Sequence, residues 1–318
     1  MTMFSIITPV YNCEEFISQT VDSVLETASN YIFEYLVIDD GSTDHTPDIL
    51  LNYGSMIRYI RQENLGQSFA ISNAIELALG DFLLVVNADD PLITEDLFRD
   101  ALEILENDEE VVATYPDWQI IDNSGNVVEI IHVKEYSIEE LVGRFNCLIG
   151  PGGIFRREAA QKIGGWDKNF RFVPDYDFWL RMSDLGSFKH VPRVQATWRT
   201  HNNSISIGSR GKEMAEERIR VINNYLLRNP NLPEELKRMS IANSTYRAAV
   251  LSYFDNRING RKLVWKSLTT YPKIIFEKNL LILTYLLCTP FSGYIMRAIN
   301  SRLNLKRLEA NLQRNIKS

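Results

Sequence analysis

The sequence predicts an α/β fold in which a mostly parallel sheet is flanked by helices and followed by a C-terminal helical region. Short apolar runs rich in β-branched residues alternate with helical stretches over the first half of the chain. A chain of 318 residues is long enough for one large domain and a smaller one. A composition of 45% hydrophobic and 24% charged residues is typical of a soluble globular protein.

The expected elements follow one another in a regular order. Strands are predicted at 4–10, 34–40, 56–60 and 81–87, and helices at 14–27, 42–53 and 66–79. Serine and threonine stand at the start of the second helical stretch, where they suit an N-cap. Because strands that alternate with helices of this length form a parallel sheet covered on both faces, we expect that arrangement here.

Polar side chains stand where each of these strands ends. They are Thr8 and Tyr11, then Asp39 and Asp40, then Asn64, and finally Asn87, Asp89 and Asp90. The carboxyl ends of parallel strands meet at one edge of a sheet, and ligands bind beyond that edge. A helix start explains one of these acids, since Asp90 before Pro91 suits an N-cap followed by proline. The alternative is a divalent cation held by Asp89 and Asp90.

The cysteine spacing and the absence of common motifs argue against several classes of protein. The three cysteines form no CxxC pair, which argues for a reducing compartment and against both a disulfide framework and a zinc site. The usual nucleotide motifs, GxGxxG and GxxxxGK[ST], are missing. The chain enters a strand pattern at once, so we expect no secretory signal.

The net charge of −7 conceals an asymmetry. Residues 261–318 carry eleven Lys and Arg against two acids, whereas the rest of the chain has a net charge of −16. Residues 279–296 contain no charged residue but are interrupted by Pro290 and Gly293. This pattern favours a helical tail that lies on an anionic membrane surface rather than one that binds nucleic acid. The alternative is a helical subdomain that packs on the main domain or on a second subunit.

Four sequence blocks together resemble the family 2 glycosyltransferases of the GT-A fold. They are SIITPVYNCEEFISQTVDSVL, YLVIDDGSTDHT, ENLGQSFAISNAIELALGDFLLVVNADD and PDYDFWLRM, and the resemblance covers residues 3–205. It implies a catalytic domain over 1–208, with a nucleotide-sugar half at about 1–92 and an acceptor half at about 93–208. The helical region would then span 209–318.

The resemblance implies a nucleotide-sugar site. Base and ribose would be held by Thr8, Pro9, Tyr11 and Asp40, and the pocket would be lined by Asn64, Gly66, Gln67 and Asn73. From the residues alone, a carboxylate at Asp40 can accept from a base N–H, and it can equally cap the next helix.

The NADD stretch matches the family's metal-binding motif. The resemblance places Asp89 near the ribose and diphosphate and gives Asp90 the role of ligand to Mn²⁺ or Mg²⁺, with Asp89 and His201 as further ligands. Asn87 stands where many relatives have another aspartate. We expect Asn87 to contact the donor rather than the metal.

Two later stretches complete the expected site. By resemblance, Asp175 is the catalytic base, although it also suits an N-cap, and Arg199 and His201 close over the diphosphate. Asp177 is expected to pair with Arg181. The glycines at 150, 152 and 153 would allow close approach of an acceptor-binding strand, and Trp118 and Trp179 are assigned to the core.

The resemblance therefore implies an inverting, metal-assisted glycosyltransferase. It would move a sugar from a nucleotide diphosphate, with UDP favoured, to a glycan or lipid-linked acceptor in polysaccharide or cell-envelope synthesis. The alternatives are a catalytically silent binding module on the same fold and a sugar nucleotidyltransferase. A cytoplasmic protein, peripheral on the inner face of the membrane and able to form a homo-oligomer, fits this reading.

Overall fold

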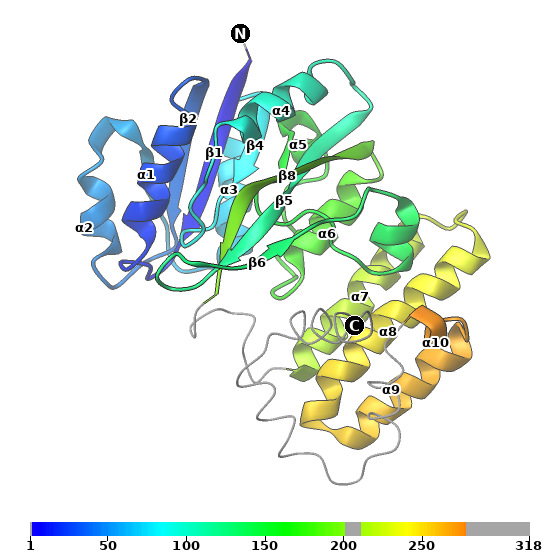
Figure 1. Ribbon diagram of the computed structural model, residues 1–318. Helices are drawn as coiled ribbons and strands as arrows, with labels where there is room; N and C mark the ends of the chain where they lie inside the picture. The colour runs from blue at the N-terminus through cyan, green and yellow to red at the C-terminus, as the bar shows by residue number, and fades with distance from the viewer. Residues whose placement is uncertain (1, 201–210, 278–318) are drawn as a thin grey trace. The chain divides into compact units, whose positions relative to one another are not determined.

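The computed structural model describes residues 2–200 and 211–277 and divides the chain into two compact units (Figure 1). Residues 1–141 and 147–201 form the first unit, and residues 142–146 and 202–318 form the second. Residues 142–146, which the sequence assigned to the acceptor half, are therefore grouped with the C-terminal helices.

The first unit contains one sheet and its covering helices. The strands are β1 (Met3–Val10), β2 (Ile32–Asp39), β3 (Arg58–Arg61), β4 (Phe82–Val85), β5 (Val111–Ile121), β6 (Val127–Ile131), β7 (Ile154–Arg156) and β8 (Ser187–Arg199). The helices are α1 (Ile17–Thr27), α2 (Thr46–Leu51), α3 (Gln67–Leu77), α4 (Asp96–Leu105), α5 (Arg157–Lys162) and α6 (Pro174–Met182).

The sheet is mixed but mostly parallel, which confirms the predicted fold class. Its order is β3-β2-β1-β4-β7-β5-β6, and β8 pairs with β5. Strands β1 to β4 are mutually parallel, β7 runs antiparallel to both β4 and β5, and β8 is parallel to β5. It follows that β1, β2, β4, β5 and β8 all end at the same edge.

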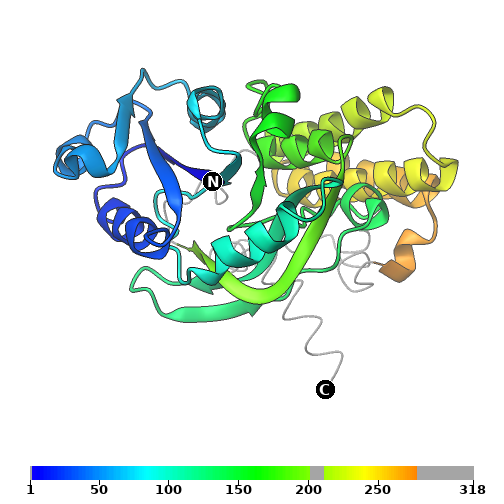
Figure 2. The same ribbon diagram turned by 90° about the horizontal axis from the view of Figure 1, so that it is seen from above.

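The core of this unit follows from the alternation of side chains along the strands. Phe4 and Ile6 of β1 point to the face covered by α1 and α4, where they meet Val21 and Phe98. The rings of Phe4 and Phe98 lie edge to face with centroids 5.0 Å apart. Figure 2 shows α3 and α5 on the opposite face of the sheet.

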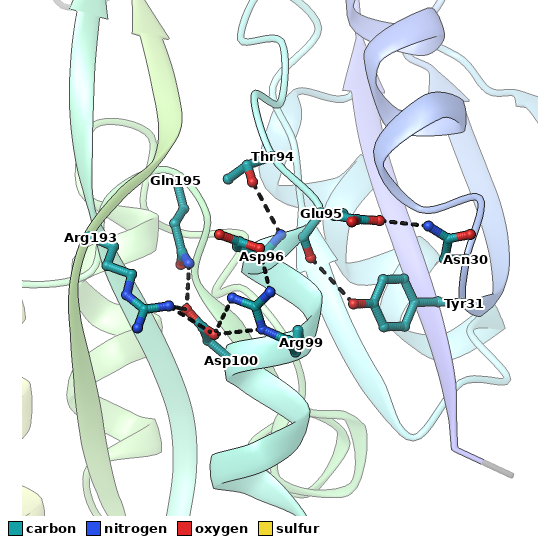
Figure 3. A network of polar contacts seen from close by, with 9 residues as sticks. All are labelled: Asn30, Tyr31, Thr94, Glu95, Asp96, Arg99, Asp100, Arg193 and Gln195. Atoms are coloured by element: carbon teal, nitrogen blue, oxygen red, sulfur yellow. Dashed lines mark hydrogen bonds and ion pairs between the residues drawn. The ribbon is translucent and has the colours of Figure 1, made fainter.

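Helix α4 is held to its neighbours by polar contacts as well as by apolar packing (Figure 3). The carboxylate of Asp100 accepts from Gln195 Nε2 at 2.7 Å and from Arg193 Nη1 at 3.1 Å, both on β8. At the start of the helix, Asn30 donates to Glu95 Oε2 at 2.6 Å. Asp100 therefore fixes α4 against the strand that ends at the polar edge.

The second unit is helical in its described part. It contains α7 (Gly211–Arg228), α8 (Glu234–Asp255), α9 (Arg257–Thr270) and α10 (Ile274–Glu277). Its core includes Ala242, Tyr246, Val264 and Ile274. Residues 142–146 join it through a hydrogen bond from Asn243 Nδ2 to the Gly143 carbonyl, 3.0 Å long. None of the helices described here is long and apolar enough to cross a membrane, and the stretch 279–296 lies outside the described residues.

We expect Asp100→Ala to lower the free energy of unfolding by about 1–3 kcal/mol, because Gln195 would lose its partner inside the protein. Urea denaturation followed by circular dichroism measures this change. Asp96→Ala on the same helix is the matched control, since the Asp96 carboxylate is 40% exposed and pairs with Arg99 at the surface. Equal destabilisation by the two variants would contradict the role of Asp100.

Candidate functional site

Two loops at the polar edge are fastened to each other. One follows β1 and the other follows β2, and they exchange hydrogen bonds between main chain and side chain. Asn12 N donates to Ser42 Oγ at 3.0 Å, Thr43 N donates to Asn12 Oδ1 at 2.7 Å, and Cys13 N donates to Thr46 Oγ1 at 2.9 Å. Asn12 adopts a positive φ of 48°, which asparagine tolerates better than most residues. This exchange holds Tyr11, whose side chain is 49% exposed, at the edge.

The two aspartates after β2 have separate structural roles. Asp39 is fully buried, and it accepts from Ser42 N at 2.8 Å and from the hydroxyl of Tyr59 at 2.7 Å. Asp39 therefore closes the turn after β2, whereas the sequence analysis had given the capping alternative to Asp40. Asp40 takes no part in that turn and contacts the loop after β3 instead.

Asp40 organises the loop that leads into α3. Its Oδ1 accepts from Gln62 Nε2 at 2.7 Å and from Leu65 N at 2.9 Å, and its Oδ2 accepts from Gly66 N at 2.7 Å. Gly66 has a φ of +99°, a conformation that favours glycine. Asn64, between these contacts, is exposed.

A chain of hydrogen bonds continues from this loop to the acids after β4. Gln67, the first residue of α3, donates to Asn87 Oδ1 at 3.1 Å. Asn87 in turn donates from Nδ2 to Asp90 Oδ2 at 2.8 Å. The loops after β2, β3 and β4 thus form one connected polar surface, as the strand order predicted.

Asp89 and Asp90 differ in environment. Asp90 is 3% exposed, and its two oxygens accept from Asn87 Nδ2 and from Arg199 N. Burial raises the pKa of Asp90 well above its usual value, and the charge of Asp89 raises it further. Asp89 is only partly buried. The role of Asp90 as principal metal ligand stays a prediction, and in this structure each of its oxygens accepts a hydrogen bond from within the protein.

Arg199 is engaged within the protein. Its side chain is 1% exposed and donates four hydrogen bonds within the protein, which leaves little of it for a phosphate. The acceptors are the carbonyls of Asp89, Asp122 and Asn123 and the side chain of Gln19. In this structure the Arg199 side chain joins loops, and its pairing with a phosphate stays a prediction.

Asp175 lies in the first turn of α6 and is partly exposed. The segment before this helix packs on α3. The Phe170 carbonyl accepts from Ser68 Oγ at 3.2 Å, and the Trp166 carbonyl accepts from Ser72 Oγ at 2.9 Å. Ser68 follows Gln67, which contacts Asn87, so the approach to Asp175 is tied to the polar edge through α3.

Other predicted residues have clear positions. Thr8 is fully buried and its hydroxyl lies 2.9 Å from that of Tyr35, so its side chain faces the interior; Pro9 is also buried. Asp177 pairs with Arg181 at 2.7 Å, which confirms that prediction. His201 lies outside the described residues.

The predicted core tryptophans lie next to glycines of the segment before β7. Trp118 and Trp179 are buried, as predicted. A Cβ at Gly150 would meet Trp118 Nε1 at 2.8 Å, and one at Gly152 would meet Ala196 Cβ at 2.8 Å. These glycines let the segment before β7 lie close to β5 and β8, and the close approach of an acceptor to it stays a prediction.

Gln62 is a site residue that the sequence analysis missed. It joins Asp40 to Asn73, which donates to Gln62 Oε1 at 2.8 Å. Its position directly after β3, among the other polar strand exits, is the feature that could have identified it. Gln19 had no such feature, because it lies within a helix and its partner is distant in sequence.

A metal ion would depend on few protein ligands. Within residues 2–200 and 211–277, no group of three or more His, Cys, Asp or Glu side chains is suited to hold a metal. Mg²⁺ sites of this kind use one or two carboxylates and complete the shell with substrate phosphates and water. The partly exposed Asp89 fits that requirement.

The chain matches the family described as Glycosyl transferase family 2 over residues 5–164. It is 27% identical to the chondroitin synthase of Escherichia coli over 270 residues, which make up 84% of this chain and 36% of that protein. The chain therefore spans little more than a third of the length of this relative.

Solved structures of similar fold carry nucleotide ligands. The structure of S. aureus TarS 1–349 in complex with UDP-GlcNAc has a TM-score of 0.66 at 17% identity, covering 90% of this chain and 84% of that one. The mannosyltransferase PcManGT from Pyrobaculum calidifontis, in complex with GDP-Man and Mn²⁺, has a TM-score of 0.57 at 15% identity, covering 97% and 82%. These similarities confirm the predicted GT-A fold.

Proposed function

The chain belongs to glycosyl transferase family 2, and from that premise we propose that it transfers a sugar from a nucleotide diphosphate to a saccharide or lipid-linked acceptor. The observation that supports this proposal is the connected polar edge that runs from Asp40 through Asn87 to Asp89 and Asp90. The polysaccharide synthase among its relatives fits an acceptor of the same class.

We propose uridine as the base, because of the acceptor capacity left on Asp40. A carboxylate has about four acceptor positions, and the protein uses three of them, two on Oδ1 and one on Oδ2. One donor can therefore still bind. Uracil presents a single N–H on its pairing edge, whereas guanine presents an N–H beside an amino group. Tyr11, exposed on the adjoining loop, can stack on the base.

We assign the metal contact to Asp89, with Asn87 nearby as a neutral oxygen. Mn²⁺ or Mg²⁺ bound there would neutralise the charge that develops on the diphosphate as it leaves. Asp90 stabilises the loop that carries Asp89, because it accepts hydrogen bonds from Asn87 and from the main chain at the end of β8. The complex of PcManGT with GDP-Man and Mn²⁺ supports a metal in a protein of this fold.

Asp175 is proposed as the general base. The acceptor hydroxyl oxygen attacks the anomeric carbon, the bond from that carbon to the diphosphate oxygen breaks, and the hydroxyl proton passes to the carboxylate of Asp175. A single displacement of this kind inverts the anomeric centre. The partial exposure of Asp175 at the start of α6 allows contact with an acceptor.

We also propose that the C-terminal region contacts an anionic membrane on its inner face. Helix α9 contains four Lys and Arg and no acid. Trp265, 60% exposed, and Ile258, 69% exposed, lie on this helix with Lys262 between them. A basic helix with an exposed tryptophan suits the headgroup region of a bilayer.

Binding measured by calorimetry tests the nucleotide assignment. We expect UDP to bind about 1–3 kcal/mol more tightly than GDP, because guanine would leave a buried donor unsatisfied at Asp40. Mn²⁺ should strengthen UDP binding in the wild type, and Asp89→Ala should remove that increase while uridine binding remains. Asp48→Ala, an exposed acid on α2, is the control. Tighter binding of GDP, or a full Mn²⁺ effect in Asp89→Ala, would refute the assignments.

Asp175→Asn should preserve UDP-sugar binding and lower turnover by about 10²–10⁴-fold, because the amide cannot accept the hydroxyl proton. The measurement is UDP release with an acceptor that supports turnover by the wild type. Asp184→Asn, an exposed acid just beyond the same helix, should retain the normal rate. A near-normal rate in Asp175→Asn would assign the base to another residue.

Vesicle flotation tests the membrane proposal. The full chain should float with vesicles that contain phosphatidylglycerol, and less with pure phosphatidylcholine. Combining Trp265→Ala with Lys262→Glu should reduce flotation, whereas Lys212→Glu on α7 should not. Recovery of the wild type in the unbound fraction with both vesicle types would exclude this partner.

A further inference from the structure

We propose that His190 is a positioning residue that carries a proton on each ring nitrogen and thereby fastens residues 132–141 to the sheet. We call these residues the strap, because they begin beside β5 and β8 and end against helix α6. The inference rests on the proposed function in one respect, since Asp175, the proposed base, lies in the first turn of α6. The fastening itself is measurable without any substrate.

Both ring nitrogens of His190 face a carboxylate. Nε2 lies 2.8 Å from Asp117 Oδ1 on β5, and Nδ1 lies 3.2 Å from Glu135 Oε1 on the strap. The side chain of His190 is 6% exposed, and its ring is stacked on that of Tyr115 with centroids 5.2 Å apart. Because an ionised carboxylate only accepts, both contacts are hydrogen bonds only when both nitrogens carry a proton. A neutral ring can make one of the two.

Asp117 joins the strap to the sheet from β5. Its Oδ1 also accepts from Val133 N at 2.9 Å, and its Oδ2 lies 2.7 Å from His132 Nδ1. Burial alone would raise the pKa of Asp117, but the hydrogen bonds from Val133, His132 and His190 outweigh burial and lower that pKa overall. Asp117 therefore stays ionised over the range in which histidine ordinarily changes its charge.

The second histidine of this cluster does not depend on its charge in the same way. His132 is exposed and contacts Asp117 through Nδ1 alone. A neutral imidazole with its proton on Nδ1 keeps that contact. The contact between His190 and Glu135 is therefore the one that needs the second proton.

Phenols and lysines complete the titratable surroundings of His190. Tyr115 lies against its ring and Tyr136 lies on the strap, and burial raises the pKa of both phenols. Lys134 forms an ion pair within the strap, and Lys189 on β8 is exposed. The phenols therefore add no charge near the ring over the range in which histidine titrates.

The far end of the strap contacts α6. The carbonyl of Leu141 accepts from the hydroxyl of Tyr176, and Leu141 is fully buried. Between the two ends, the ring of Tyr136 packs on that of Phe188 of β8, with centroids 4.7 Å apart. Tyr176 follows Asp175 directly, so a strap fastened at its first end also steadies the turn that carries Asp175.

Loss of one proton from His190 weakens the first end. The proton that remains stays with the buried Asp117, at the shorter distance, and the lone pair on Nδ1 then faces the carboxylate of Glu135. Glu135 is 71% exposed and can turn into water instead. The strap is therefore fastened at acidic pH and loosened as the pH rises.

Hydrogen–deuterium exchange of the full chain, read by mass spectrometry, tests the fastening. The measurements are made at about pH 5 and about pH 8, the limits between which histidine ordinarily changes its charge, and are corrected for the intrinsic effect of pH on exchange. We expect strap peptides to exchange about 10-fold faster at the higher pH, because a hydrogen bond to a charged group is lost. Peptides of α2, beside the exposed His45, should show no such change.

Two variants separate protonation from packing. Glu135→Gln supplies an amide that donates to a neutral ring or accepts from a charged one, so the strap should stay protected at both pH values. His190→Gln has no ring proton to lose, so exchange of the strap should be the same at both values. His45→Gln is the matched control and should keep the wild-type response. If His190→Gln does not fold, Glu135→Gln decides, because its side chain lies at the surface.

UDP release with an acceptor that supports turnover gives the second measurement. The ratio of the rate at about pH 8 to the rate at about pH 5 should be higher in Glu135→Gln than in the wild type, because the turn that carries Asp175 stays steadied. His45→Gln should keep the wild-type ratio.

Two results would overturn the inference. One is equal exchange of the wild-type strap at the two pH values, and the other is a wild-type pH response in Glu135→Gln, either in exchange or in the rate ratio. If exchange behaves as expected but Asp175→Asn turns over at a near-normal rate, the proposed base is wrong while the fastening by His190 stands.

Discussion

Two carboxylates stand side by side at the end of a buried strand, and the structure of the polar edge depends on how their repulsion is resolved. The two differ in burial, since Asp90 is buried and Asp89 is partly exposed. Asp90 is withdrawn from solvent and accepts hydrogen bonds from Asn87 and from the main chain of Arg199. Its raised pKa reflects what burial beside Asp89 costs. Asp89 remains partly exposed at this edge, which is why we propose it as the contact for a cation.

The two adjacent acids after β2 also differ in their contacts. Asp39 closes its own turn, and Asp40 holds the loop that leads into α3. In both pairs the two acids look equivalent in sequence, yet the structure gives each member a different environment. The hydrogen bonds through which Asp40 shapes the loop also consume most of its acceptor capacity. That partial saturation is the physical basis for preferring a base with a single donor.

The polar edge is built from loops that are distant in sequence. Gln67 contacts Asn87, and Ser68 contacts the segment that leads to Asp175. Helix α3 therefore connects the loop after β4 with the segment that leads to Asp175. Arg199 provides a second connection, from β8 to the loops after β4 and β5. Each connection uses a side chain that bonds to main chain or amide groups, which fixes loop position.

The sequence by itself determined the fold class, the family and the edge at which polar residues gather. It could do so because strand and helix periodicities are local, and because parallel strands must end at a common edge. It also identified the core tryptophans and the pair of Asp177 with Arg181, which lie one helical turn apart. Only the tertiary structure decided which aspartate of each pair is engaged, why Thr8 faces the interior, and what Arg199 contacts. Those outcomes depend on acceptors such as the carbonyls of Asp89 and Asp122, which every residue carries and which no sequence pattern marks.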